Sequence, residues 1–106
     1  MAELTNDAHI DVQVSFEGTT AVIRPTGELD LATVPVLRRA IDRATAGPID
    51  RVVFELEGVA FMDSSALSAL LRTVNPGRVV EVRSASSSVR RVLETTGVAE
   101  ILGFRP

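Results

Sequence analysis

The feature that most constrains this chain is residues 51–74, RVVFELEGVAFMDSSALSALLRTV, where one apolar spacing changes into another. The segment opens with a short β-branched and aromatic run that predicts a strand buried on both faces, namely Val52, Val53, Phe54 and Leu56. From Ala66 the apolar residues recur at the spacing of one helix face, namely Leu67, Leu70, Leu71 and Val74. Asp63, Ser64 and Ser65 therefore lie where a buried strand ends and a helix begins.

This junction has a chemistry of its own. The first turn of a helix has N–H groups without intrahelical partners and carries the positive end of the helix dipole. Asp63 or Ser64 can cap these donors, and Ser65 holds its hydroxyl where an attached phosphate would meet them. Taken alone, the tripeptide favours an ordinary helix cap, because capping residues occur at every helix start.

The N-terminal half of the chain predicts a hairpin followed by a helix. Residues 12–16 alternate apolar and polar side chains, and a turn at residues 18–20 leads to a second strand over residues 21–24. Pro25 limits central pairing because it donates no ladder hydrogen bond. Residues 27–30 are predicted to be a loop into a helix, which Asp30 or Thr33 could cap and Gly47-Pro48 ends. Its predicted apolar face is Val34, Leu37, Ile41 and Ala44.

The C-terminal part predicts one more strand and one more helix. Asn75-Pro76-Gly77 ends the central helix, residues 79–82 form a strand, and a serine at 86–88 caps a helix that Gly97 terminates. The expected order is β-β-α-β-α-β-α, an α/β fold with a small mixed sheet flanked by helices. A chain of 106 residues fits one domain over residues 1–106, with residues 1–8 expected to be flexible.

Several kinds of function are disfavoured. A serine hydrolase is disfavoured because the sequence contains no G-x-S-x-G motif, and its only histidine, His9, lies in the polar N-terminal region. We therefore expect no enzymatic activity. With one histidine and no cysteine, the sequence lacks the usual ligands of a metal site. It also contains no glycine-rich nucleotide-binding motif, so no cofactor is expected. A net charge of −3 disfavours nucleic acid. Without a leader or a long apolar run, a cytoplasmic location is expected.

The segment Phe61-Met62-Asp63-Ser64-Ser65-Ala66-Leu67, with GELDLAT at 27–33 and VRRVLETTGV at 89–98, resembles the STAS domain family, the bacterial anti-sigma factor antagonists in particular. The resemblance covers nearly the whole chain. It implies that the unphosphorylated protein binds an anti-sigma factor with serine kinase activity and so releases a sigma factor. Phosphorylation of the serine breaks the complex, and a phosphoserine phosphatase could oppose the kinase.

The family's phosphorylated hydroxyl directly precedes a glycine, so the resemblance assigns phosphorylation to Ser65. Ala66 stands where the family has that glycine, and its added methyl group is expected to hinder a kinase. Glu55 stands where an aspartate is common. The residues expected to bind the partner are Glu28, Asp30, Asp63, Ser64, Ser65 and Ala66.

Two alternatives stay open. Glu28 and Asp30 could simply form a solvated loop with one cap. The whole chain could also be a non-switching STAS module, either a scaffold or a soluble subunit of a lipid-transport complex, which would never need phosphate on Ser65.

Overall fold

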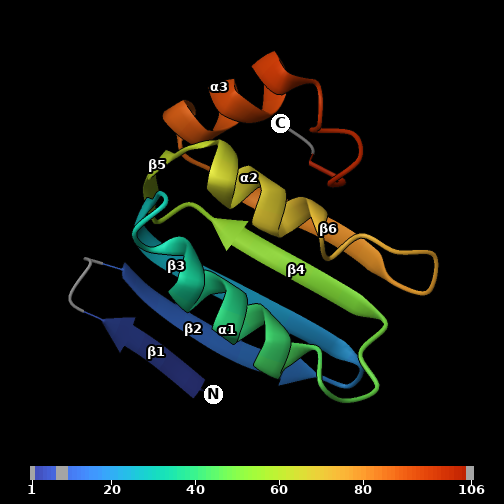
Figure 1. Cartoon of the computed structure of the whole chain (residues 1–106). Helices are drawn as coiled ribbons and strands as arrows, with labels where there is room; N and C mark the ends of the chain where they lie inside the picture. Colours follow the sequence, from blue (N-terminus) through green and yellow to red (C-terminus); the bar gives the residue numbers. More distant parts are fainter. Residues whose placement is uncertain (1, 7–9, 105–106) are drawn as a thin grey trace.

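The computed structural model describes residues 2–6 and 10–104 and shows a β-sheet with helices packed on it (Figure 1). Within that part of the chain the elements are β1 (Ala2–Asn6), β2 (Ile10–Glu17), β3 (Thr20–Leu29), α1 (Val34–Ala44), β4 (Arg51–Leu56), β5 (Val59–Met62), α2 (Ser64–Leu71), β6 (Val79–Ala85) and α3 (Ser87–Thr96). The sheet order is β1-β2-β3-β4-β6, and β5 pairs with β3 outside this path.

The sheet is mixed, as predicted. β1, β2 and β3 pair antiparallel, whereas β3 with β4, β4 with β6, and β3 with β5 are parallel. Parallel neighbours require crossover connections, and α1 and α2 supply these on the same face of the sheet (Figure 1). The predicted face of α1 is buried: Val34, Leu37, Ile41 and Ala44 all belong to the core.

β3 changes its parallel partner midway along its length. It pairs with β4 over residues 20–23 and with β5 over residues 27–29, and Pro25, which has no N–H, lies between these stretches. The turn from β4 to β5 passes very close to β3. A Cβ atom at Gly58 would lie 2.4 Å from Cγ2 of Thr26, so a side chain at position 58 would force the exposed Thr26 side chain to shift. This switch of partner brings β5, and the helix after it, to the end of β3.

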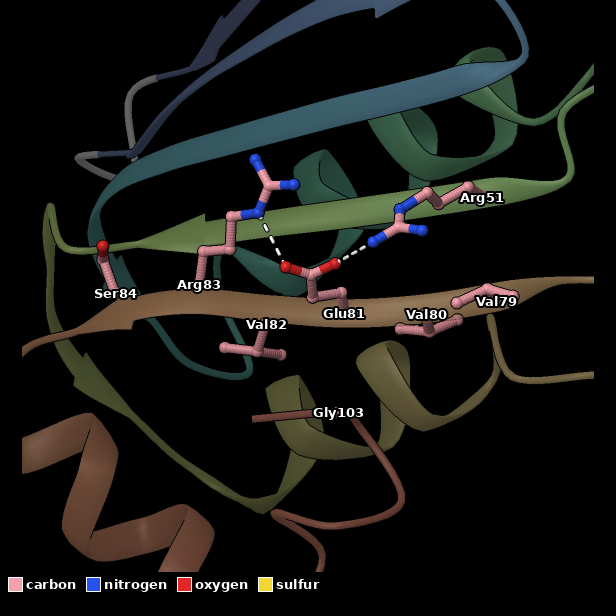
Figure 2. Close-up of a pocket in the computed structure, with 8 residues that line it drawn as sticks. All are labelled: Arg51, Val79, Val80, Glu81, Val82, Arg83, Ser84 and Gly103. Atoms are coloured by element: carbon pink, nitrogen blue, oxygen red, sulfur yellow. Dashed lines mark hydrogen bonds and ion pairs between the residues drawn. The ribbon is translucent and has the colours of Figure 1, made fainter. Parts of the chain in front are cut away.

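The face of the sheet opposite α1 and α2 is covered by charged side chains. Val22 and Val53 are buried there, outside the main core cluster. Arg24 forms an ion pair with Glu55. Figure 2 shows the Glu81 carboxylate between the guanidinium groups of Arg83 and Arg51, with a 2.7 Å contact to Nε of Arg83. Paired charges thus shield the valines from water.

Residues 2–6, for which the sequence predicted no strand, form β1, because the backbone of β2 offers an edge whose hydrogen bonds do not depend on side-chain pattern. Two further expectations about secondary structure were wrong. β5 was missed because a four-residue strand carries too little periodicity to detect. Glu28 lies in β3 and not in a loop. The other predicted boundaries at α3 are confirmed: Ser86 caps the helix and Gly97 ends it with φ of 75°.

Candidate functional site

The junction between β5 and α2 is held from two sides. On one side Leu29 pairs with Met62, and the N–H of Asp63 donates to the carbonyl of Leu29 at 3.0 Å. On the other side the hydroxyls of Ser86 and Ser88 donate to the carbonyls of Val59 and Ala60 at 2.6 and 2.8 Å. The start of α2 is therefore fixed by β3 and by the first turn of α3, which lie far apart in the sequence.

Asp63 is the cap of α2. Its Oδ1 accepts hydrogen bonds from the N–H of Ser65 at 2.9 Å, the N–H of Ala66 at 3.2 Å and the hydroxyl of Ser65 at 2.6 Å. Of the two capping residues that the sequence allowed, Asp63 and Ser64, the structure selects Asp63. The half-buried Ser65 hydroxyl is thus oriented by a carboxylate, while Ser64 is exposed.

The hydrogen bonds to Asp63 also control its charge. Burial acts to raise the pKa of Asp63, but hydrogen bonds from the Ser65 hydroxyl and from the N–H groups of Ala66, Ser65 and Leu31 outweigh it, so the pKa lies below its usual 3.8. Asp63 is therefore an anion at neutral pH and a weak base. It can orient the Ser65 hydroxyl but is poorly suited to remove its proton.

The cap determines what a phosphate on Ser65 would meet at this helix end. The sequence predicted that it would meet the N–H groups of the first turn, and in the structure Asp63 accepts from the N–H groups of Ser65 and Ala66. A phosphate on Ser65 would also remove the proton that Ser65 shares with Asp63. An added phosphate would therefore compete with the native cap and would not simply complete it.

Asp30 stabilises the turn that precedes α1, whose N-cap residue is Thr33 and has no side-chain capping hydrogen bond. Its Oδ1 accepts from the N–H groups of Ala32 and Thr33 at 3.0 and 3.1 Å, and its own N–H donates to Oγ1 of Thr33 at 2.9 Å. Thr33 in turn donates to the carbonyl of Glu28 at 2.7 Å. This turn precedes α1 and adjoins Asp63 through the contact of Leu31 with the Asp63 carboxylate.

The predicted acidic residues come together. Glu28 pairs with Phe61 in the β3–β5 register, one residue before the Leu29–Met62 pair that leads to Asp63. Glu28 is exposed and Asp30 is half-buried, so both reach the surface near Ser65. Their proximity to the start of α2 was expected from the sequence and is observed.

Ala66 differs from the expectation. Its side chain is fully buried in the core, so its methyl group cannot obstruct a partner at the surface, and the steric argument was wrong. The reason is helix geometry, since the third residue of α2 points inward toward the sheet. Only its N–H takes part in the site, through Asp63.

Two apolar residues of this surface were missed. The side chains of Leu31 and Phe61 are 77% and 48% exposed, and they flank the acidic and hydroxyl groups. The available signal for Leu31 was an apolar residue inside the polar turn GELDLAT. Phe61 was hidden because apolar residues surround it in the sequence and it looked like part of a buried strand.

Across residues 10–104 no group of three or more His, Cys, Asp or Glu side chains is arranged to hold a metal ion. No helix in this part of the chain is long and apolar enough to cross a membrane. His9, the sole histidine and the only candidate base, lies outside the described residues.

Comparison with known proteins gives consistent matches. Residues 11–106 match the STAS domain family. An anti-sigma F factor antagonist of Lysinibacillus sphaericus is 33% identical over 84 residues, which cover 74% of this chain and 72% of that protein.

Two solved structures are also similar to this chain. An anti-sigma factor antagonist from Mycobacterium paratuberculosis has a TM-score of 0.85 at 25% identity, covering 97% of this chain and 91% of that one. The Bacillus cell fate determinant SpoIIAA in its phosphorylated form has a TM-score of 0.61 at 29% identity, with 84% and 86% covered.

Proposed function

Because this chain belongs to the STAS domain family, we propose that it is an anti-sigma factor antagonist, a binding protein and not an enzyme. In this proposal the unphosphorylated form binds an anti-sigma factor with serine kinase activity and so releases a sigma factor. Phosphorylation at Ser65 ends the binding. The observation that carries the proposal is the half-buried Ser65 hydroxyl, which donates to Asp63 at 2.6 Å at the start of α2.

The binding site would be the surface around the start of α2, which we call the switch surface. It comprises Glu28, Asp30, Leu31, Phe61, Asp63, Ser64 and Ser65. Exposed apolar side chains surrounded by polar groups are typical of protein interfaces, where a few apolar anchors supply most of the affinity. Leu31 and Phe61 would be these anchors, and the acidic residues would set the charge that the partner must complement. Ala66 takes part only through its backbone.

Phosphorylation would then act by charge and by loss of a hydrogen bond. The γ-phosphoryl group of ATP is transferred to Oγ of Ser65, the P–O bond to ADP breaks, and the hydroxyl proton leaves to a base of the kinase. The product carries about two negative charges beside Asp63, Glu28 and Asp30. In the complex this phosphate would be buried together with the carboxylates of its own surface, so its desolvation and their mutual repulsion both oppose binding. Asp63 would also lose the hydrogen bond from the Ser65 hydroxyl.

The direct test incubates the protein with candidate kinase-type anti-sigma factors and ATP, and maps phosphate by mass spectrometry. We expect one phosphate, on Ser65, and none on Ser65→Ala. Ser64→Ala is the matched control, because Ser64 is the exposed neighbour whose hydroxyl takes no part in the cap, and it should be phosphorylated like wild type. Phosphate on Ser64 or Ser87 would disprove the assignment.

A second test concerns binding by the unphosphorylated protein. Leu31→Ala and Phe61→Ala should each weaken binding to the anti-sigma factor by about tenfold or more. Ile101→Ala and Phe16→Ala are matched controls, because these side chains are 58% and 52% exposed but lie outside the switch surface, and they should bind like wild type. Equal losses in all four variants would contradict the proposed surface.

The alternative is a STAS module that does not switch. This alternative would be favoured if a partner binds the switch surface but phosphorylates neither the wild type nor any variant. The switch surface would then remain a binding site, but its partner would not act as a kinase.

A further inference from the structure

A second charged feature lies at the opposite end of α2 from Ser65. A cavity of about 260 Å³ between α1 and α2, which we call the arginine pocket, is lined by Arg38, Asp42, Thr45, Arg72, Thr73 and Arg78. Arg38, Asp42 and Thr45 come from α1 and its C-terminal cap, Arg72 and Thr73 follow α2, and Arg78 precedes β6. Three arginines and one aspartate thus line one cavity in a chain whose net charge is −3.

These arginines differ from those on the sheet. Arg24 forms an ion pair with Glu55, and Arg51 and Arg83 share the Glu81 carboxylate. Figure 2 shows the Glu81 pairs. Within residues 10–104, by contrast, no ion pair involves any of the three arginines of the pocket. The fold therefore gathers three positive charges here with one carboxylate, Asp42, in the same lining.

Arg78 gives the second observation. Its Nε is buried from solvent and has no hydrogen-bond partner in the described part of the chain. A buried donor left without an acceptor is destabilising, so such groups are uncommon in native proteins and call for an explanation. A helix C-terminus attracts cations and would account for Arg72, which caps α2. It does not account for Arg78, which lies in the turn before β6.

The other polar side chains that line the arginine pocket indicate the chemical class of its ligand. The hydroxyls of Thr45 and Thr73 already donate to the carbonyls of Ile41 and Leu70 at 2.8 and 2.6 Å. The uncommitted donors are therefore guanidinium N–H groups, which pair with phosphate oxygens through two parallel hydrogen bonds. The volume lies below the roughly 300–1,000 Å³ of pockets that take drug-sized ligands. This size suits a phosphate group better than a whole nucleotide.

We propose that the arginine pocket binds a phosphate group, either free phosphate or the head of a small phosphomonoester. The group would accept hydrogen bonds from the guanidinium groups of Arg38, Arg72 and Arg78. Because Nε of Arg78 is buried from solvent, the Arg78 side chain would turn toward the cavity for Nε to reach this acceptor. This site is separate from the switch surface, and its ligand does not depend on phosphorylation of Ser65.

The test is an NMR titration of ¹⁵N-labelled protein with inorganic phosphate at constant ionic strength, set with sodium chloride. We expect saturable amide shifts in residues 38–45 and 69–78. Arg38→Gln and Arg78→Gln should each weaken binding by about tenfold, because each removes hydrogen bonds to a charged group. The same spectra report whether each variant is folded.

Two matched variants complete the test. Arg39→Gln removes an exposed arginine of α1 that does not line the pocket, and it should bind phosphate within about twofold of wild type. Ser65→Ala should bind phosphate unchanged, which separates this site from the switch surface. A parallel titration with glycerol 3-phosphate distinguishes a phosphomonoester from free phosphate as the ligand. If glycerol 3-phosphate binds more tightly than phosphate, the ligand is a monoester; if it binds equally or more weakly, the ligand is free phosphate.

Shifts that never saturate, or that weaken equally in Arg39→Gln and Arg78→Gln, would show a general effect of cationic surface and would overturn the proposal.

Discussion

Replacement of Asp63 tests the local architecture of the candidate site most directly. In Asp63→Ala the N–H groups of Ser65 and Ala66 and the hydroxyl of Ser65 lose their common acceptor. Loss of a cap costs about 1 kcal/mol, and loss of a carboxylate at a helix N-terminus costs about 0.3–1 kcal/mol more. We therefore expect unfolding free energy to fall by about 1.5 kcal/mol. This corresponds to a melting temperature about 7 °C lower for a chain of this size.

Asp63→Asn separates the cap from the charge. Asparagine caps helices about as well as aspartate, so only the charge term should be lost, about 0.5 kcal/mol. Ser64→Ala is the control at the adjacent exposed position and should change stability by less than about 0.5 kcal/mol. The order of stability should be wild type, then Asp63→Asn, then Asp63→Ala.

The difference between wild type and Asp63→Asn should depend on pH. Hydrogen bonds in the folded state lower the pKa of Asp63 below 3.8, so folding favours the charged carboxylate. The resulting stability is complete above the pKa of the unfolded chain and is lost as pH falls through the lowered pKa of the folded state. The two proteins should therefore differ at neutral pH and converge in acid.

The assay is urea unfolding followed by far-ultraviolet circular dichroism, because the chain has no tryptophan or tyrosine to report by fluorescence. If Asp63→Asn costs as much as Asp63→Ala, the charge and not the hydrogen bonds dominates the cap. If neither variant differs from wild type, the assignment of Asp63 as the cap is refuted.

Two further predictions concern packing. Ala66→Gly should lower unfolding free energy by about 1–2 kcal/mol in the same urea assay, because the methyl group is buried and glycine disfavours helix; an unchanged midpoint would argue that Ala66 is not in the core. Gly103→Ala should destabilise by about 1–3 kcal/mol, because φ is +60° and a Cβ atom would lie 2.7 Å from the carbonyl oxygen of Val80. Gly47→Ala is its control, since a Cβ atom there meets nothing within 4 Å, and a similar loss in both would discount the contact of residue 103 with β6.

The sequence by itself determined the features that depend on near neighbours in the chain. The alternation over residues 12–16, the helix spacing of α1, and caps such as Ser86 and Gly97 are local, because a few consecutive residues contain all the groups involved. The position of Asp63 and Ser65 at a helix start was predictable for the same reason. The sequence could not choose between Asp63 and Ser64 as the cap, since both side chains carry a suitable oxygen.

Only the tertiary structure decided what depends on distant residues. The pairing of β5 with β3 placed Phe61 at the surface beside Glu28, although its neighbours in the sequence are apolar. The packing of α2 on the sheet buried Ala66, which removed the steric argument based on its methyl group. Arg38, Arg72 and Arg78 are separated in the chain and meet only because α1 and α2 lie side by side. In each case the deciding contacts join segments whose spacing along the chain says nothing about their distance in space.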